Sequence, residues 1–454
     1  MSRKPPGGTR DFLPEEIRRR EYVVRIVRDV YERYGFEPLE TPAFENIETL
    51  LGKYGDEGNK LIFKILKRGE YEASREADLA LRYDLTVPLA RVVAQYQNEL
   101  PKFFKRYQIQ PVWRADRPAR GRFREFYQCD IDAIGSASAV VEVEQIAAVN
   151  EILTKLGFAD FRLLVNHRRI LTGLLEVSGI AAAQHETALV ALDKLDKIGH
   201  KGVEAECAAR GIEPQKTTSL LEMLRDIFTV PLDGESSTGL INTSRLESLD
   251  NFLASTAYAG AVGELRAIVR LVGSTPAAER VFVDPRLARG LSYYTGAIME
   301  VAVDGIGSLG GGGRYDNLIG MFLGRDVPAC GFSLGLERII VVMTERSMFP
   351  ATVARGGVDV MVTIWSDEAR GDLLTLAAEL RRAGLRVDVY PESDKLGKQV
   401  KYAASRNVSF VAILGDDERA RGEVAVKDLR TGDQQSVPRA EAPQFIARRL
   451  NPEP

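Results

Sequence analysis

The chain has 454 residues, of which 45% are apolar and 28% charged, and its net charge is −3 at pH 7. This length predicts two or three domains that each bury a core, and the composition is typical of a globular protein, not a disordered one. The charge excludes a globally basic nucleic-acid binder, so any contact with RNA must come from local basic surface.

Membrane and metal classes are also disfavoured. No apolar run reaches the ~18 residues of a membrane span. The first residues do not form a signal-peptide core, so we expect a cytoplasmic protein. Cys129, Cys207 and Cys330 are too few and too scattered for a disulfide framework. Without a Cys-x-x-Cys motif or clustered histidines, we expect no protein metal site.

The chain begins with a predicted helix and a proline-containing strand. Apolar residues recur at helical spacing over residues 14–34, and Gly35 is the expected stop. Residues 36–42 resemble a strand, but Pro38 and Pro42 cannot donate to a sheet ladder. We therefore expect an edge strand or an interface segment.

The next elements predict an antiparallel sheet interrupted by helices. Strand-like runs alternate with polar turns over residues 79–91 and 106–135, and a helix is expected over 140–156. From about 170 to 275 the pattern changes to helical periodicity rich in Ala and Leu, which indicates a helical insertion. The sheet is expected to resume at Val281.

The remaining sequence predicts the end of the first domain, a linker and a second domain. Residues 1–349 form the expected catalytic domain, and 350–357 are rich in Pro, Ala and Gly, as in a linker. Residues 358–454 alternate as β-α-β-α-β, which predicts a small α/β domain with a mostly parallel sheet.

Five arginines lie within eleven residues, from Arg114 to Arg124, between two strand-like runs. A solvated hairpin tip would explain them. A guanidinium also pairs bidentately with phosphate, and a long arginine-rich loop could grip an RNA end. In the following strand Gln128, Asp130 and Asp132 alternate on one face. They are either the wet side of a sheet or, with the polar run at residues 82–86, a site for an amino group.

Three Gly/Arg clusters lie within fifty residues. They are residues 289–296 (RGLSYYTG), 310–316 (GGGGRYD) and 331–338 (GFSLGLER). A fixed cation beside phenols and glycines could hold a small polar ligand together with a phosphate. The clusters therefore suggest one anion-rich pocket.

These runs carry a family resemblance. Residues 113–116 with the loop and 126–128 resemble motif 2 of class II aminoacyl-tRNA synthetases, residues 331–338 resemble motif 3, and the segment through Pro42 resembles motif 1. Within that class the chain resembles the histidyl-tRNA synthetase family over nearly its whole length. The runs that carry this closer resemblance are 8–11, 289–291, 312–316 and, in the C-terminal domain, 395–399.

The resemblance implies an α+β catalytic domain with a central antiparallel sheet, a helical insertion and a C-terminal α/β anticodon-binding domain. It implies a histidine–tRNA ligase that activates histidine with ATP and Mg²⁺ and passes it to histidine tRNA. Motif 1 implies a homodimer. An editing role for the insertion is not expected, because a site that hydrogen-bonds a polar side chain rejects apolar look-alikes without proofreading. One alternative is the related regulatory subunit of ATP phosphoribosyltransferase, and another is a ligase with a carrier other than tRNA.

Site residues follow from the same resemblance. Arg114 matches the arginine on the α-phosphate, Asp116 stands where the family usually has glutamate, and Arg338 matches the arginine on the γ-phosphate. Arg289 matches an arginine that bridges the α-phosphate and the substrate carboxylate. The expected catalytic residues are Arg289 and Arg114, and the expected ATP-binding residues are Arg114, Asp116, Arg122 and Arg338.

The expected histidine-binding residues divide into two groups. One surrounds the amino and carboxyl groups, and the other the imidazole. They are Asp84, Thr86, Gln128, Asp132 and Arg289, and then Tyr293, Tyr294 and Tyr315. The chain departs from the family at Ser292, where aspartate is common. The loss of a negative charge there either weakens histidine binding or re-routes a hydrogen bond.

Overall fold

The computed structural model describes residues 3–69, 76–228, 237–288, 293–354 and 357–450. The chain divides into two compact units, which are Met1–Phe12 with Arg20–Met348, and Leu13–Arg19 with Phe349–Pro454. No helix in the described ranges is both long and apolar enough to cross a membrane.

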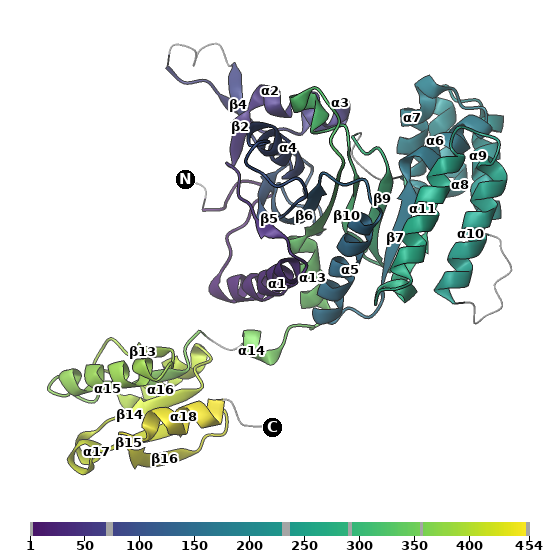
Figure 1. The fold of residues 1–454 in the computed structure, drawn as a ribbon. Helices are drawn as coiled ribbons and strands as arrows, with labels where there is room; N and C mark the ends of the chain where they lie inside the picture. The colour runs from purple at the N-terminus through teal and green to yellow at the C-terminus, as the bar shows by residue number, and fades with distance from the viewer. Residues whose placement is uncertain (1–2, 70–75, 229–236, 289–292, 355–356, 451–454) are drawn as a thin grey trace. The chain divides into compact units, whose positions relative to one another are not determined.

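The first unit is built on an eight-stranded sheet whose central strands are antiparallel (Figure 1). The edge pairs β1 with β5 and β8 with β7 are parallel. The predicted α+β fold is confirmed, and the segment with Pro38 lies at the sheet edge, as expected. Across the sheet the strands are β1 (Glu37–Pro38), β5 (Phe104–Trp113), β6 (Glu125–Ile134), β11 (Ala329–Gly335), β10 (Gly307–Arg314), β9 (Ala297–Val303), β7 (Phe161–His167) and β8 (Val281–Val283).

Strand β10 carries four consecutive glycines, and its neighbours leave no room for side chains. A Cβ on Gly312 would lie 2.1 Å from the carbonyl oxygen of Gly331 in β11. A Cβ on Gly313 would lie 2.5 Å from the oxygen of Ala297, just inside β9. The glycine run therefore has a packing role in the sheet, beside the pocket described below.

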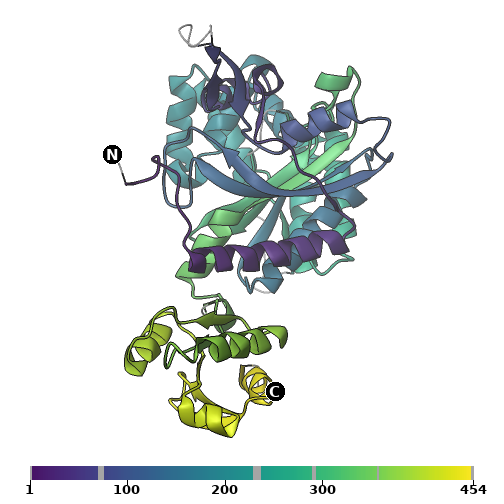
Figure 2. The ribbon, with the colours of Figure 1, turned by 90° about the vertical axis from the view of Figure 1, so that its left-hand side faces the viewer.

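Two long helices pack on the sheet, and α1 runs across one of its faces in Figure 2. They are α1 (Pro14–Arg33) and α5 (Val140–Lys155). The buried hydroxyl of Tyr31 in α1 donates to the carbonyl of Cys129 at 2.9 Å. The buried amide of Gln145 in α5 donates to the carbonyl of Cys330 at 2.7 Å. These contacts tie the helices to β6 and β11, the strands that carry much of the site.

The prediction of a strand-like run over residues 79–91 is wrong in its second half. Strand β4 (Ala77–Leu81) is followed by helix α4 (Thr86–Gln95). The carboxylate of Asp84 accepts the backbone N–H of Val87 at 3.0 Å, which satisfies a donor that the first turn would leave free. Strand β4 lies in a separate antiparallel sheet with β2 (Phe44–Asn46) and β3 (Lys64–Leu66), beside the short helices α2 (Ile47–Leu50) and α3 (Gly55–Lys60).

The described residues between β7 and β8 are helical, as predicted, and they lie together beside β7 (Figure 1). The α-helices are α6 (Arg168–Val177), α7 (His185–Leu192), α8 (Leu195–Ala209), α9 (Pro214–Phe228), α10 (Thr238–Leu253) and α11 (Ala259–Val272). Short 3-10 turns are η2 (Ala182–Gln184) and η3 (Ala278–Arg280). After β10, the helices are α12 (Gly320–Leu323) and α13 (Leu336–Glu345).

The second unit contains a five-stranded sheet in the order β13-β12-β14-β15-β16. Three strands are parallel, but β15 and β16 are antiparallel, so the expectation of a mostly parallel sheet is only partly right. Antiparallel strands such as β15 and β16 can be joined by a short hairpin, whereas parallel strands need a long crossover connection. The alternating β-α-β-α-β pattern did not distinguish this last hairpin from a further crossover. The strands are β12 (Val360–Val362), β13 (Val387–Val389), β14 (Phe410–Ile413), β15 (Glu423–Asp428) and β16 (Gln434–Pro438).

Helices of the second unit lie beside this sheet, and most of them contribute to its two apolar cores. They are α15 (Arg370–Arg382), α16 (Leu396–Ser405), α17 (Asp416–Arg421) and α18 (Ala442–Leu450). The predicted linker begins with a further short helix, α14 (Ala351–Ala354), and residues 355–356 lie outside the described part of the chain.

Candidate active site

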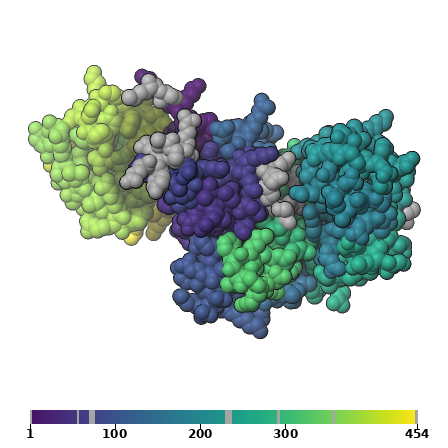
Figure 3. Space-filling view, turned by 90° about the horizontal axis from the view of Figure 1, so that it is seen from above, coloured from purple at the N-terminus to yellow at the C-terminus, as the bar shows by residue number. Residues whose placement is uncertain are grey.

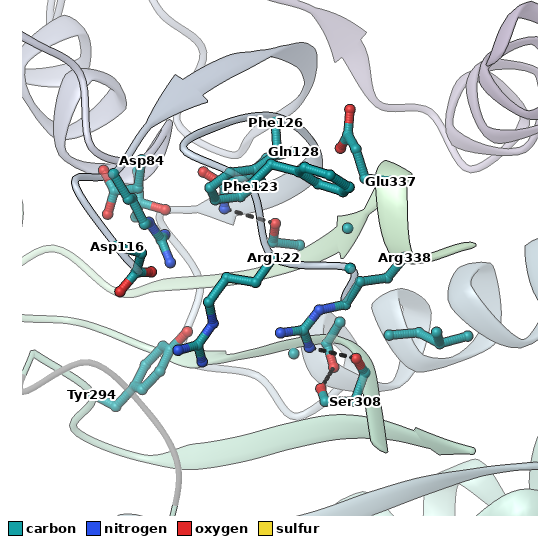
Figure 4. Close-up of a pocket in the computed structure, with 18 of the residues that line it drawn as sticks. Asp84, Asp116, Arg122, Phe123, Phe126, Gln128, Tyr294, Ser308, Glu337 and Arg338 are labelled. Atoms are coloured by element: carbon teal, nitrogen blue, oxygen red, sulfur yellow. Dashed lines mark hydrogen bonds between the residues drawn. The ribbon is translucent and has the colours of Figure 1, made fainter. Parts of the chain in front are cut away.

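A pocket of about 290 Å³ opens over β6, β10 and β11 in the first unit (Figure 4). Figure 3 shows the first unit from above, with the helices between β7 and β8 (teal) at one end of it. Side chains from several separate segments meet in the pocket. Its walls are formed by Asp84, Thr86, Arg114, Asp116, Gly121, Arg122, Phe123, Phe126, Gln128, Tyr293, Tyr294, Ser308, Leu309, Gly310, Gly311, Ser333, Gly335, Glu337 and Arg338.

Three arginine side chains are among the residues that line this pocket. The Nε of Arg114 donates to the carbonyl of Tyr83 at 3.1 Å, and its guanidinium carbon lies 4.3 Å from the Tyr83 ring centroid. The Nη1 of Arg338 donates to the carbonyl of Ser308 at 2.6 Å. Arg122 points toward the same space in Figure 4. A guanidinium that is held and stacked in this way is already oriented for a phosphate.

Two residues of the pocket wall, Asp84 and Gln128, carry buried acceptor oxygens. The Oδ1 of Asp84 accepts from the Tyr54 hydroxyl and from the Val87 N–H, both at 3.0 Å. Its Oδ2 and the Oε1 of Gln128 are buried, and neither has a hydrogen-bond partner among the described residues. Burial raises the pKa of Asp84, while the Val87 N–H and Arg114 oppose the rise. Two such acceptors suit a ligand that brings several N–H donors.

Aromatic rings form another part of the wall. The rings of Tyr293 and Tyr294 meet edge-on at 5.1 Å, and Tyr293 contacts the Tyr315 ring in the same way at 5.9 Å. Burial is the main cause that raises the pKa of all three phenols, so they remain neutral hydroxyls at physiological pH. Neutral phenols can stack on a planar ligand and hydrogen-bond to it.

Two of the predicted histidine-binding residues do not line the pocket. Asp132 is buried, and its carboxylate lies 2.8 Å from the Nη2 of the equally buried Arg106. The hydroxyl of Tyr315 donates to the other carboxylate oxygen of Asp132. These side chains form a layer next to the pocket wall, and their predicted contacts with a ligand stay predictions.

The anion-rich pocket expected from three Gly/Arg clusters needs a correction at Arg314. Its Nε and Nη2 donate to the two carboxylate oxygens of buried Glu142 at 2.6 and 2.9 Å, and its Nη1 to the Ser136 carbonyl at 3.0 Å. This arginine is therefore a structural ion pair and is absent from the pocket wall. Arg289 and Ser292 lie outside the described residues, so their predicted roles stay predictions.

Some pocket residues were not singled out from the sequence. Glu337 accepts from the Nη1 of Arg20 at 2.8 Å and from the N–H of Tyr127 at 2.9 Å. The hydroxyl of Ser333 accepts from the Nε2 of Gln128 at 2.9 Å. Ser333 and Glu337 belong to the run at 331–338, where strand alternation could have identified Ser333 as facing Gln128. No local pattern marks Phe123 and Phe126 as pocket residues.

Comparison with known proteins places this geometry in a family. Residues 8–339 match the family model described as histidyl-tRNA synthetase. The chain belongs to the histidyl-tRNA synthetase family. Residues 359–449 match a second model, described as an anticodon-binding domain.

Relatives of the family are similar along the whole chain. A histidine–tRNA ligase from Gloeobacter violaceus is 42% identical, covering 98% of both chains. One from Porphyromonas gingivalis is 43% identical, covering 97% of this chain and 98% of the relative. Among solved structures, the histidyl-tRNA synthetase from Nostoc sp. PCC 7120 has a TM-score of 0.81 and 33% identity, covering 99% of this chain and 100% of its own.

A more distant structure shares the fold alone. It is described as an ATP phosphoribosyltransferase regulatory subunit/histidyl-tRNA synthetase from Bacillus halodurans, with a TM-score of 0.70 and 21% identity. It covers 91% of this chain and 99% of its own. At this identity it carries no argument about activity.

Proposed function

We propose that the chain is a histidine–tRNA ligase. It converts histidine and ATP to histidyl-adenylate and pyrophosphate, and then transfers the histidyl group to the 3′-hydroxyl of the terminal adenosine of histidine tRNA. The observation that carries this proposal is a single pocket that combines Arg114, Arg122 and Arg338 with the buried acceptors of Asp84 and Gln128. Family membership supports the same activity.

Activation is a displacement at phosphorus. A carboxylate oxygen of histidine forms a bond to the α-phosphorus of ATP, and the bond to the bridging oxygen breaks, so pyrophosphate leaves with its electron pair. Negative charge builds on the phosphate oxygens in the transition state, where preorganised guanidinium groups stabilise it most. Arg114 is assigned to the α-phosphate and Arg338 to the γ-phosphate, with Asp116 and Arg122 contributing to ATP binding. Arg289 is assigned to the α-phosphate and the substrate carboxylate.

Histidine is held by neutral and negative acceptors. Its ammonium group has three N–H donors, which fit the free Oδ2 of Asp84 and the free Oε1 of Gln128. Thr86 completes this side, and Tyr293 and Tyr294 offer rings to the imidazole. Asp132 and Tyr315 are also assigned to histidine, although they lie in the buried layer next to the pocket wall and not in the wall itself. In the second step the tRNA hydroxyl attacks the carbonyl carbon, and AMP leaves.

Magnesium is proposed as the partner of ATP. The described residues contain no cluster of three or more His, Cys, Asp or Glu side chains that could hold a metal ion. Asp116 and Glu337 line opposite sides of the pocket (Figure 4), and both carboxylate oxygens of Glu337 already accept hydrogen bonds from Arg20 and Tyr127. Asp116 is therefore the carboxylate that would hold Mg²⁺, an ion usually bound by substrate phosphates, water and one or two carboxylates. When bound, the ion neutralises charge on the departing phosphates.

The regulatory-subunit alternative is not favoured. A protein that only binds a ligand does not need pocket arginines in position for a triphosphate, and the chain retains a matched anticodon-binding domain. Ligation to another carrier is disfavoured for the same reason.

We further propose that the protein is a homodimer of about twice the 50.2 kDa chain mass. Light scattering measures this mass directly, and a fully active monomer would refute the proposal. The cytoplasmic location stays a prediction.

Charging of tRNA tests the proposed function. The full chain is incubated with ATP, Mg²⁺, labelled histidine and a transcript of histidine tRNA. We expect acid-precipitable label on this transcript and none on a transcript of another tRNA. Formation of histidyl-adenylate without transfer to any tRNA would indicate a different acceptor, and no reaction at all would favour the regulatory alternative.

A further inference from the structure

A buried carboxylate lies behind the pocket and has no assigned role. Asp130 is 2% exposed, is absent from the pocket wall, and is paired directly with Ser333 in the β6–β11 register. The Ser333 hydroxyl accepts from the Nε2 of Gln128 at 2.9 Å (Figure 4). Ser333 also lowers the pKa of the Asp130 carboxyl that lies opposite it. The Ser333 hydroxyl keeps a proton of its own to donate, and the Asp130 carboxylate opposite it has an Oδ1 without a hydrogen-bond partner among the described residues. Asp130, Ser333 and Gln128 therefore form a row of polar side chains that ends in the pocket.

A serine hydroxyl has one proton, so Ser333 can donate to Asp130 or to Gln128 but not to both. When the proton is donated to the Asp130 carboxylate, the Ser333 oxygen can only accept, and Gln128 must offer its amide nitrogen. The Gln128 Oε1 is then left for the pocket, where it is buried without a partner among the described residues. A protonated Asp130 could instead donate to Ser333. The serine would then donate to Gln128, and the amide would turn its N–H donors toward the ligand.

We propose that Asp130 is a positioning residue that sets the orientation of the Gln128 amide through Ser333, and thereby controls the affinity for the ammonium group of histidine. This inference rests on the proposed function and deepens it. The ionised carboxylate presents an oxygen to the ammonium group. The neutral acid presents N–H donors, which a cation disfavours.

The surroundings of Asp130 place the switch in the physiological range. Burial raises the pKa of Asp130 to about 7, opposed mainly by Arg106. Neighbouring Asp132 is held by Arg106 at 2.8 Å and by the Tyr315 hydroxyl, so the shared proton belongs on Asp130. The groups that interact electrostatically with Asp130 from adjoining elements are Arg106, Asp132, Asp84, Arg82, Cys129, Tyr31 and Tyr294.

The pH dependence of histidine binding tests the inference. For a single group of pKa about 7, the ionised fraction falls about tenfold between pH 8 and pH 6, so the KM for histidine should rise by about the same factor as pH falls. Histidine itself titrates in this range. The readout is therefore the ratio of parent to variant KM at each pH. Both proteins meet the same substrate, so its titration cancels.

Three single variants and one double variant test the link between Asp130 and Gln128. Asp130→Asn and Ser333→Ala should each flatten the pH-dependent part of the histidine KM, and the double variant should add nothing further. Ser333→Thr, which keeps the hydroxyl, should retain the parent profile. The KM for ATP and the thermal midpoint serve as controls. If Asp130→Asn fails to fold, Ser333→Ala and Ser333→Thr still decide the matter.

The outcomes separate this inference from the proposed function. Parent-like pH profiles in both Asp130→Asn and Ser333→Ala, with histidine activation intact, would overturn the positioning role alone. An equal rise in the KM for histidine and the KM for ATP, with an unchanged pH profile, would indicate that the Asp130 carboxylate is merely structural. This result would also overturn the positioning role. A parent protein that does not activate histidine would instead contradict the proposed function.

Discussion

Arg114 and Arg120 come from the same arginine-rich run but have different surroundings. Arg114 lies in the pocket, where it stacks on Tyr83 and donates to its carbonyl. Arg120 has a side chain that is 68% exposed and paired with Glu345 at the surface. The sequence predicted either a loop that binds phosphate or a solvated tip. The structure places Arg114 in the pocket and Arg120 at the surface, and phosphate binding by Arg114 stays a prediction.

This difference predicts unequal effects of substitution. Arg114→Ala should slow histidyl-adenylate formation by about 10²–10³, the scale of losing one transition-state donor, without changing the thermal midpoint. Arg120→Ala should leave the rate within about threefold of the parent, because an exposed ion pair contributes little. Single-turnover adenylate assays compare them. Equal losses in both variants would contradict the assignment of Arg114.

Arg314 should behave in the opposite way. Its partner Glu142 is 2% exposed, so Arg314→Ala leaves a buried carboxylate unpaired and should cost about 3–5 kcal/mol of unfolding free energy. Arg314→Met with Glu142→Gln should recover part of that loss. Urea denaturation measures both. A stable Arg314→Ala protein with impaired ATP binding would restore the anion-binding interpretation that the ion pair replaces.

At the scale of the elements, the close approach of the neighbouring strands leaves room only for glycine at Gly312 and Gly313 of β10. Gly312→Ala would place a methyl group against the backbone of β11, so it should destabilise the protein by about 1–3 kcal/mol or more. Gly263→Ala is the matched control. This glycine lies inside α11 with nothing within 4 Å of an added Cβ, and the change should stabilise by up to about 1 kcal/mol. Thermal unfolding distinguishes the two, and an unaffected Gly312→Ala protein would refute the packing argument.

Most elements were predictable because their patterns are local. The apolar period of α1 and the stop after α5 depend on neighbouring residues, and the structure places both helices within two residues of the prediction. The helix from Thr86 was missed because its apolar run resembles a strand until the hydrogen bond from the Val87 N–H to the Asp84 carboxylate is considered. Likewise, the pairing of Arg314 with Glu142 joins residues 172 positions apart, which no local pattern reveals.

At the scale of the whole molecule, the two units should separate in function. A chain ending after Thr352 keeps the pocket and should make histidyl-adenylate at a rate near the parent's, yet charge tRNA poorly. Lys395, Lys398 and Lys401 suggest a basic edge on the missing part, although Lys398 also pairs with Asp394 at 2.8 Å. Charging and activation are measured on the same preparations. Equal charging by truncated and full chains would count against an anticodon-binding role.

The central claim is that this pocket activates histidine with ATP. Amino-acid-dependent exchange of labelled pyrophosphate into ATP measures that step without tRNA, and all twenty amino acids can be tested on the full-length protein. We expect exchange with histidine and none above background with the other nineteen. Exchange driven by a different amino acid, or none with histidine, would contradict the account.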